Sequence, residues 1–292
     1  MGDFFIFACN PKTYKMKYPH LVIFVLLATT LAFGQNKEKI KGSKIVVEKP
    51  VEIGDFTALE IEDNLTVFLE KGEKNEIKVE TDDNLQEIIS FDIKEKTLRI
   101  YTSKEISSFK KLTLKIKYTN DLKSVIAKNA VIINALEAVQ LDDITFKSLD
   151  FARLYLNVNS KNFSLISDDK SKTELNLKAE KSKIQLSKNA QIKALITTTD
   201  LAFDMYQKTT AIIEGEAVNA IIRQGNNSTF TGFNLTIKNA DVTTEHEAVC
   251  NVMAETSLIA DADNKSKIYV LGTPRIEVRK FLGEAQLIKK AK

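Results

Sequence analysis

The sequence predicts an all-β protein: a right-handed β-helix-like solenoid of short rungs that follows an antiparallel-β opening section. In two long stretches, residues 54–118 and 173–270, apolar and polar residues alternate with a period of two. This alternation is typical of strands that bury one face. The segments recur at spacings near the roughly 20 residues of one solenoid coil. A β-sandwich or barrel of ordinary strands shows similar spacing and remains the alternative fold.

The second stretch contains polar bends as well as strands. Leu177 lies at an odd position of its apolar set, whereas Ile184 and Leu186 lie at even positions after the polar bend Lys181-Ser182-Lys183. A shift of the buried set by one residue means that the chain turns there. No such unit can bury its apolar face alone, so stacking on neighbouring units is expected. We align the coils on Leu177, Ile196, Ile222, Ile237 and Val252, with steps of 19, 26, 15 and 15 residues.

The N-terminus has the order of a secretory signal peptide. Lys12, Lys15 and Lys17 precede a 13-residue apolar run at 21–33, and Gly34 follows it. The run is too short to span a bilayer comfortably, although a membrane anchor is the alternative. We therefore expect residues 1–34 to be removed and the chain to be exported, as a periplasmic, outer-membrane-associated or secreted protein. Met16 is the more natural start.

The rest of the chain divides into segments with different sequence patterns. We expect a linker at 35–52, the opening β section at 53–123, solenoid rungs at 124–285 and a basic tail at 286–292. Removing three lysines and one aspartate with the signal leaves 39 basic and 38 acidic residues. This balance argues against a surface that binds nucleic acid or an anionic membrane, and we expect no stable membrane insertion after signal cleavage.

The mature sequence is poorly equipped for catalysis. His246 is its only histidine and Cys250 its only cysteine, so a metal site built on several histidines is excluded. Any Ser-His-Asp arrangement would depend on His246 alone. No glycine-rich phosphate loop occurs. We expect no catalytic residue, metal or cofactor.

Two small sets of residues are candidates for ligand binding. Asp241, Asp261 and Asp263 could form an acid cluster, which would fit a carboxylate-dependent polysaccharide-cleaving β-helix enzyme as the alternative function. Asn226 and Asn227 stand in a polar bend suited to carbohydrate hydrogen bonds. Tyr206 is an aromatic side chain available to stack on a sugar.

The order of several short motifs resembles a known family. The motifs lie at residues 54–61, 65–72, 77–80, 97–100, 112–118, 122–125 and 268–274. Together they resemble the "putative auto-transporter adhesin, head GIN domain" family of exported Bacteroidetes-type proteins, over roughly residues 53–289. The sequence departs from that family at its bends, which use lysine, serine and asparagine in place of Gly-Ser-Gly-Asp-like stretches.

The resemblance implies a β-helix-like solenoid, an extracytoplasmic location and adhesion. We therefore expect an adhesin-like or cell-envelope binding protein without catalysis, whose partner is a carbohydrate or an envelope protein. A structural envelope protein is a second alternative.

Overall fold

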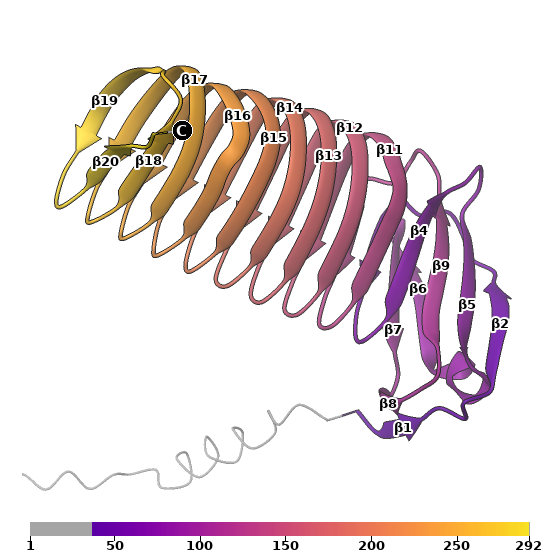
Figure 1. Cartoon of the computed structure of the whole chain (residues 1–292). Coiled ribbons are helices and arrows are strands. Elements are labelled where there is room, and N and C mark those ends of the chain that lie inside the picture. Colours follow the sequence, from indigo (N-terminus) through magenta and orange to yellow (C-terminus); the bar gives the residue numbers. More distant parts are fainter. Residues whose placement is uncertain (1–36, 292) are drawn as a thin grey trace, which may run out of the picture. The chain divides into compact units, whose positions relative to one another are not determined.

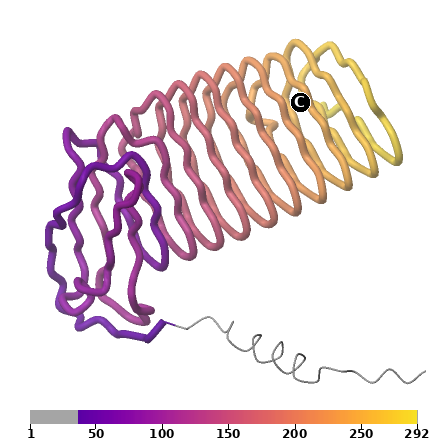
Figure 2. The backbone as a smooth tube through the Cα atoms, turned by 180° about the vertical axis from the view of Figure 1, so that it is seen from behind, coloured from indigo at the N-terminus to yellow at the C-terminus, as the bar shows by residue number. Residues whose placement is uncertain are grey.

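The protein is a β-solenoid of about nine turns, with 69% of the described residues in strands and 2% in helix. The structure is a computed structural model that describes residues 37–291. The expected signal peptide at 1–34 lies outside the described residues. The rungs stack in one row, as Figures 1 and 2 show, which confirms the predicted solenoid and excludes a sandwich. No helix among the residues described is long and apolar enough to cross a membrane.

The rungs are the strands β10 (Ser124–Ala127), β11 (Ile132–Ser148), β12 (Arg153–Ser167), β13 (Lys172–Leu186), β14 (Gln191–Met205), β15 (Thr210–Gln224), β16 (Thr229–Thr244), β17 (Val249–Ala262), β18 (Lys267–Leu271), β19 (Arg275–Phe281) and β20 (Gln286–Lys289). The rungs from β11 to β17 are long bent strands, and those at the two ends of the solenoid are shorter. In β13 the buried set runs through odd positions up to Leu177 and through even positions from Ser182. The predicted shift is confirmed, and the bend lies at Glu180 and Lys181, which are both exposed.

Successive rungs pair in parallel with a step of 19 residues through the middle of the solenoid, from Arg153 to Lys172, Gln191 and Thr210. Leu177 pairs with Ile196, as predicted. The rest of our alignment is wrong, because Ile196 pairs with Gly215. Ile222 lies in the other half of its coil.

Most turns between rungs use left-handed backbone without glycine. The non-glycine residues with positive φ at these turns are Asn129, Asp150, Asp169, Lys188, Gln207, Lys208, Asn226, Asn227, His246, Glu247, Asn264 and Lys265. Asparagine and aspartate tolerate this conformation better than other residues. The turns also stack: the Asn227 amide donates to the His246 carbonyl at 3.0 Å. Backbone hydrogen bonds between neighbouring turns therefore help to hold the left-handed conformation at residues such as Lys188 and Glu247, which do not favour it by themselves.

The opening section combines antiparallel and parallel pairs. It comprises β1 (Lys39–Lys41), β2 (Val46–Val51), β3 (Ala58–Ile61), β4 (Thr66–Lys71), β5 (Glu76–Asp82), the 3-10 helix η2 (Asp83–Ile88), β6 (Ile89–Lys94), β7 (Thr97–Thr102), β8 (Glu105–Ser108) and β9 (Leu112–Tyr118). β2–β5, β5–β9 and β6–β7 are antiparallel, as expected. β3 and β4 pair in parallel with β10 and β11, so they form the base on which the solenoid stacks. One hydrophobic core runs from Phe56 to Val270.

Glu62 ties this base together and provides a pH-dependent contribution to stability. The Arg99 guanidinium donates to both oxygens of Glu62, at 3.2 and 2.8 Å. This contact, with help from Lys128, lowers the pKa of Glu62 to about 2. The unfolded chain would have a pKa of about 4.3. The stabilisation is therefore present above about pH 4.3 and is lost as the pH falls toward 2.

We expect Glu62→Gln to lower the free energy of unfolding at pH 7 by about 1 kcal/mol. The difference in the free energy of unfolding between this variant and the wild type should disappear as the pH falls from 4.5 to 2. Urea denaturation across that pH range measures it. Glu174→Gln, at an exposed position of β13, is the control and should stay within about 0.5 kcal/mol of the wild type. A gap for Glu62→Gln that stays constant down to pH 2 would contradict the assignment.

Candidate functional site

A groove runs over the bends of successive rungs, and we call it the bend groove. Its first part has a volume of about 730 Å³ and is lined by Lys71, Asn120, Lys123, Gln140, Leu141, Asp142, Asn159, Ser160, Lys161, Lys178, Ala179 and Glu180. Its second part, of about 520 Å³, is lined by Lys178, Ala179, Thr197, Thr198, Thr199, Glu216, Ala217, Val218, Thr236, Lys238 and Glu255. The two parts share Lys178 and Ala179, so they adjoin at β13.

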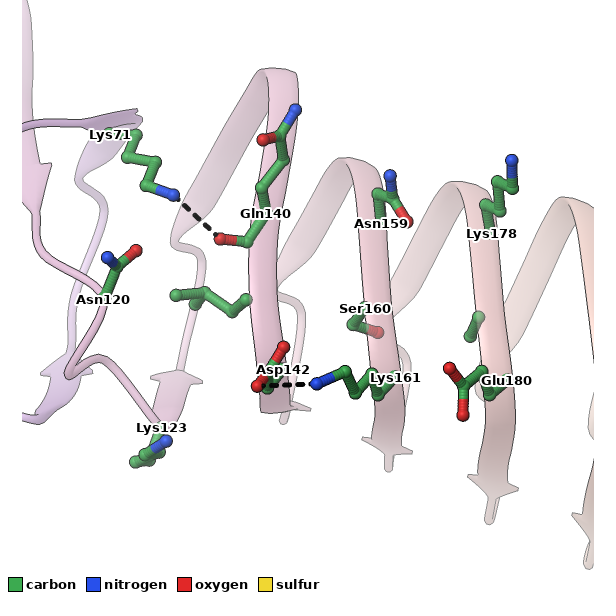
Figure 3. A pocket seen from close by; sticks show the side chains of 12 residues that line it. Lys71, Asn120, Lys123, Gln140, Asp142, Asn159, Ser160, Lys161, Lys178 and Glu180 are labelled. Carbon is green, nitrogen blue, oxygen red and sulfur yellow. Dashed lines mark hydrogen bonds and ion pairs between the residues drawn. The ribbon is translucent and has the colours of Figure 1, made fainter.

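The rung register builds the walls and floor of the groove. One wall is the column of Gln140, Asn159, Lys178, Thr197, Glu216 and Thr236, which are paired rung to rung. The floor is the next residue in each rung, and from Ser160 through Ala179 to Ala217 these residues are small. The residue after the floor forms the second wall, as with Lys161 in Figure 3. Neighbouring strands lie about 4.8 Å apart, so the five steps from β11 to β16 span about 24 Å.

The end of the groove nearest the opening section is rich in lysine; we call it the lysine end and define it by Lys71, Lys123, Lys161 and Lys178. Lys161 forms an ion pair with Asp142 at 3.0 Å, and this hydrogen bond raises the pKa of Lys161. Lys71 Nζ donates to the Gln140 carbonyl at 3.2 Å, as Figure 3 shows. The site therefore carries cations, amides and a hydroxyl, which suit polar ligand recognition.

The three predicted acids lie together on one face of the solenoid, but each is neutralised by a basic partner. Arg279 contacts Asp241 at 2.6 Å and Asp261 at 3.7 Å. Lys280 contacts Asp263 at 2.9 Å, and this hydrogen bond lowers the pKa of Asp263. A carboxylate whose oxygens are already engaged by a cationic side chain is poorly placed to donate a proton to a substrate. These contacts fit a structural role in the last rungs.

The three other predicted residues lie at the turns. Asn226 and Asn227 form the turn between β15 and β16 with φ of 54° and 64°. Asn227 Nδ2 donates to the Glu247 carboxylate of the next turn at 2.9 Å. Tyr206 follows β14 and its side chain is 45% exposed. None of the six predicted residues lines either part of the bend groove.

Cys250 lies in the core, and His246 lies in a turn. Cys250 is fully buried, and burial raises the pKa of its thiol. His246 stands in the turn after β16 with φ of 50°. Within residues 37–291, no group of three or more histidine, cysteine or acidic side chains is arranged to hold a metal ion.

The groove residues were missing from the sequence-based prediction. Most of them are ordinary polar side chains that alternate with core residues, so a single rung gives no signal. The signal lies in the repeat: at 19-residue steps from Gln140 a polar residue, a small residue and a second polar residue recur in Asn159-Ser160-Lys161 and Lys178-Ala179-Glu180. An alignment with the correct step would have found it.

Comparisons with known proteins agree with this architecture. The family model described as "Putative auto-transporter adhesin, head GIN domain" matches residues 55–274. A putative adhesin from Parabacteroides merdae ATCC 43184 is 16% identical, with a TM-score of 0.65, and the match covers 87% of this chain and 100% of that chain. A putative adhesin and a putative lipid binding protein, both from Parabacteroides distasonis ATCC 8503, are 15% and 13% identical, each with a TM-score of 0.57 and the same coverage. Among curated proteins, none matches the chain.

The chain belongs to the head GIN domain family of putative auto-transporter adhesins, because the family model covers most of its length. This confirms the resemblance seen in the sequence. At these identities the solved structures show the fold alone. The family supports an adhesin-like or binding role and an extracellular or envelope location.

Proposed function

We propose that this member of the head GIN domain family is an exported, adhesin-like binding protein that holds an extended glycan along the bend groove without cleaving it. The observation that carries the proposal is the groove itself. It crosses several rungs, and its walls are columns of mostly polar residues. Amide, hydroxyl and charged side chains in such columns offer repeated hydrogen bonds to repeated sugar units.

The absence of catalysis rests on the pairing of the acids. Asp241, Asp261 and Asp263 are each held by Arg279 or Lys280. A glycosidase needs one carboxyl group that keeps a proton at working pH and a second one across the scissile bond. Each of the three carboxylates is instead engaged by a cation, and none of them lines the bend groove in which the glycan would lie. The polar walls of the groove also favour a sugar over the acyl chain of a lipid, although one structural neighbour is described as a putative lipid binding protein.

The test is glycan-array screening with the chain that begins at Gln35, followed by affinity measurement on the glycans that bind. Asn159→Trp places a large side chain on an exposed wall of the groove and should weaken binding at least tenfold. Lys193→Trp, at an exposed position of β14 outside the groove, is the control and should leave binding within about twofold of the wild type. Equal binding by both variants would contradict the site, and release of new chain ends from a bound glycan would contradict the absence of catalysis.

A further inference from the structure

The charges at the lysine end are only partly neutralised within the protein. Lys161 is paired with Asp142, and Lys71 donates to a backbone carbonyl. In contrast, the ammonium groups of Lys123 and Lys178 have neither an ion-pair nor a hydrogen-bond partner among residues 37–291. Two cations are therefore available to a ligand in one hollow.

A buried hydroxyl at the same place also lacks a partner. Ser160 lies on the floor between Asn159 and Lys161, as Figure 3 shows. Ser160 is 8% exposed, and its Oγ is buried and has no hydrogen-bond partner among the described residues. Nearly all buried polar groups in proteins are paired, so an unpaired one at a groove floor points to a ligand atom or to water as its partner. Because this oxygen is itself buried, it can donate to a ligand in the groove only after rotation about the Cα–Cβ bond of Ser160.

The positive excess is confined to this end of the groove. Past Lys178 the walls carry Glu216 and Glu255 opposite a single further cation, Lys238. At the lysine end four ammonium groups face two carboxylates, those of Asp142 and Glu180. Opposite charges attract strongly where water is partly excluded. The lysine end therefore favours an anionic group, and the remainder of the groove favours neutral polar units.

We infer that the lysine end binds the anionic substituents, carboxylate or sulfate, of a linear acidic polysaccharide that lies along the bend groove. This inference rests on the proposed function. Lys123 and Lys178 supply the charge, and Ser160 and Asn120 supply hydrogen bonds. The lysine ammonium group is a compact point charge and lacks the planar, two-pronged donor geometry of the arginine guanidinium group. Lysine can therefore bind either a carboxylate or a sulfate group.

The experiment compares three polymers: polygalacturonate for carboxylate, dextran sulfate for sulfate, and uncharged dextran. Affinities are measured by calorimetry at two salt concentrations. The wild type should bind one or both anionic polymers at least tenfold more tightly than dextran, and more weakly at high salt. The anionic polymer that binds identifies the group.

Lys123→Gln/Lys178→Gln should lose about tenfold of that affinity and most of its salt dependence. Lys172→Gln/Lys193→Gln removes two exposed lysines outside the lysine end and should stay within about twofold of the wild type. Ser160→Ala should weaken anionic binding without lowering thermal stability, because it removes an unpaired buried hydroxyl.

The outcomes separate this inference from the proposed function. Binding to dextran as tight as to the anionic polymers, or an unchanged Lys123→Gln/Lys178→Gln variant, would overturn the inference and leave glycan binding in the groove intact. Binding of no polymer here and of no glycan on the array would overturn both.

Discussion

Phe230→Ala is expected to lower the free energy of unfolding by about 4 kcal/mol, the largest effect of any single substitution considered for this solenoid. Phe230 is fully buried in β16 and packs edge-on against Phe203 with ring centroids 5.2 Å apart. Its partners in the adjacent rungs are Ala211 and Cys250, which are both small. Because neither can expand into the space of a lost ring, alanine would leave a cavity that the backbone ladder keeps open.

The measurement is urea denaturation followed by circular dichroism. Phe151→Ala is the matched control: Phe151 is 59% exposed in a turn, with Lys170 Nζ 5.4 Å from its ring centroid. That variant should lose less than about 1 kcal/mol. Comparable losses in the two variants would contradict the placement of Phe230 in the core.

Gly215→Ala is expected to cost about 3 kcal/mol. Gly215 lies within β15 with φ of 111°, a conformation that L side chains rarely adopt. A Cβ there would stand 2.1 Å from the Ile196 carbonyl oxygen of the adjacent rung. That oxygen belongs to the ladder between β14 and β15, so relief of the clash would require the two rungs to separate locally.

Gly225→Ala is the control for this substitution. Gly225 follows β15 in the next turn, and a Cβ there would meet no atom within 4 Å. Alanine at such a site reduces the entropy of the unfolded chain and should change stability by about 0.5 kcal/mol or less in either direction. Differential scanning calorimetry on both variants tests the pair. Similar melting temperatures for the two would show that Gly215 does not hold the described backbone.

The fold was predictable from the sequence because the alternation of apolar and polar residues along a strand shows directly which side chains are buried. The apolar positions around Leu177 and Ile184 lie on the buried face, and the shift of their parity marks the bend. The coil register was not predictable in the same way. Apolar and polar residues alternate in the same way in both halves of a coil. Ile222 therefore looked like the residue that pairs with Ile196 in the next rung. The true successor is Gly215, which lacks the apolar side chain that would mark its column.

The candidate site was less predictable than the fold. The acids at Asp241 and Asp261 drew attention by type, but their neutralisation depends on Arg279, which lies 38 residues after Asp241. Only the rung register brings that arginine to them. Likewise, Asn159 and Lys178 become one wall only when β12 and β13 stack. Local pattern predicts which side chains face outward, whereas the stacking decides which of them become neighbours.

Chemical footprinting of the lysines is the most direct test of the bend groove as the binding surface. The chain is labelled with acetic anhydride, with and without polygalacturonate, and the modified lysines are quantified by mass spectrometry. We predict that the polymer lowers labelling of Lys123 and Lys178, while Lys172 and Lys193, exposed outside the lysine end, are labelled as before. Equal labelling of Lys123 and Lys178 in both conditions, or protection confined to Lys172 and Lys193, would contradict the account.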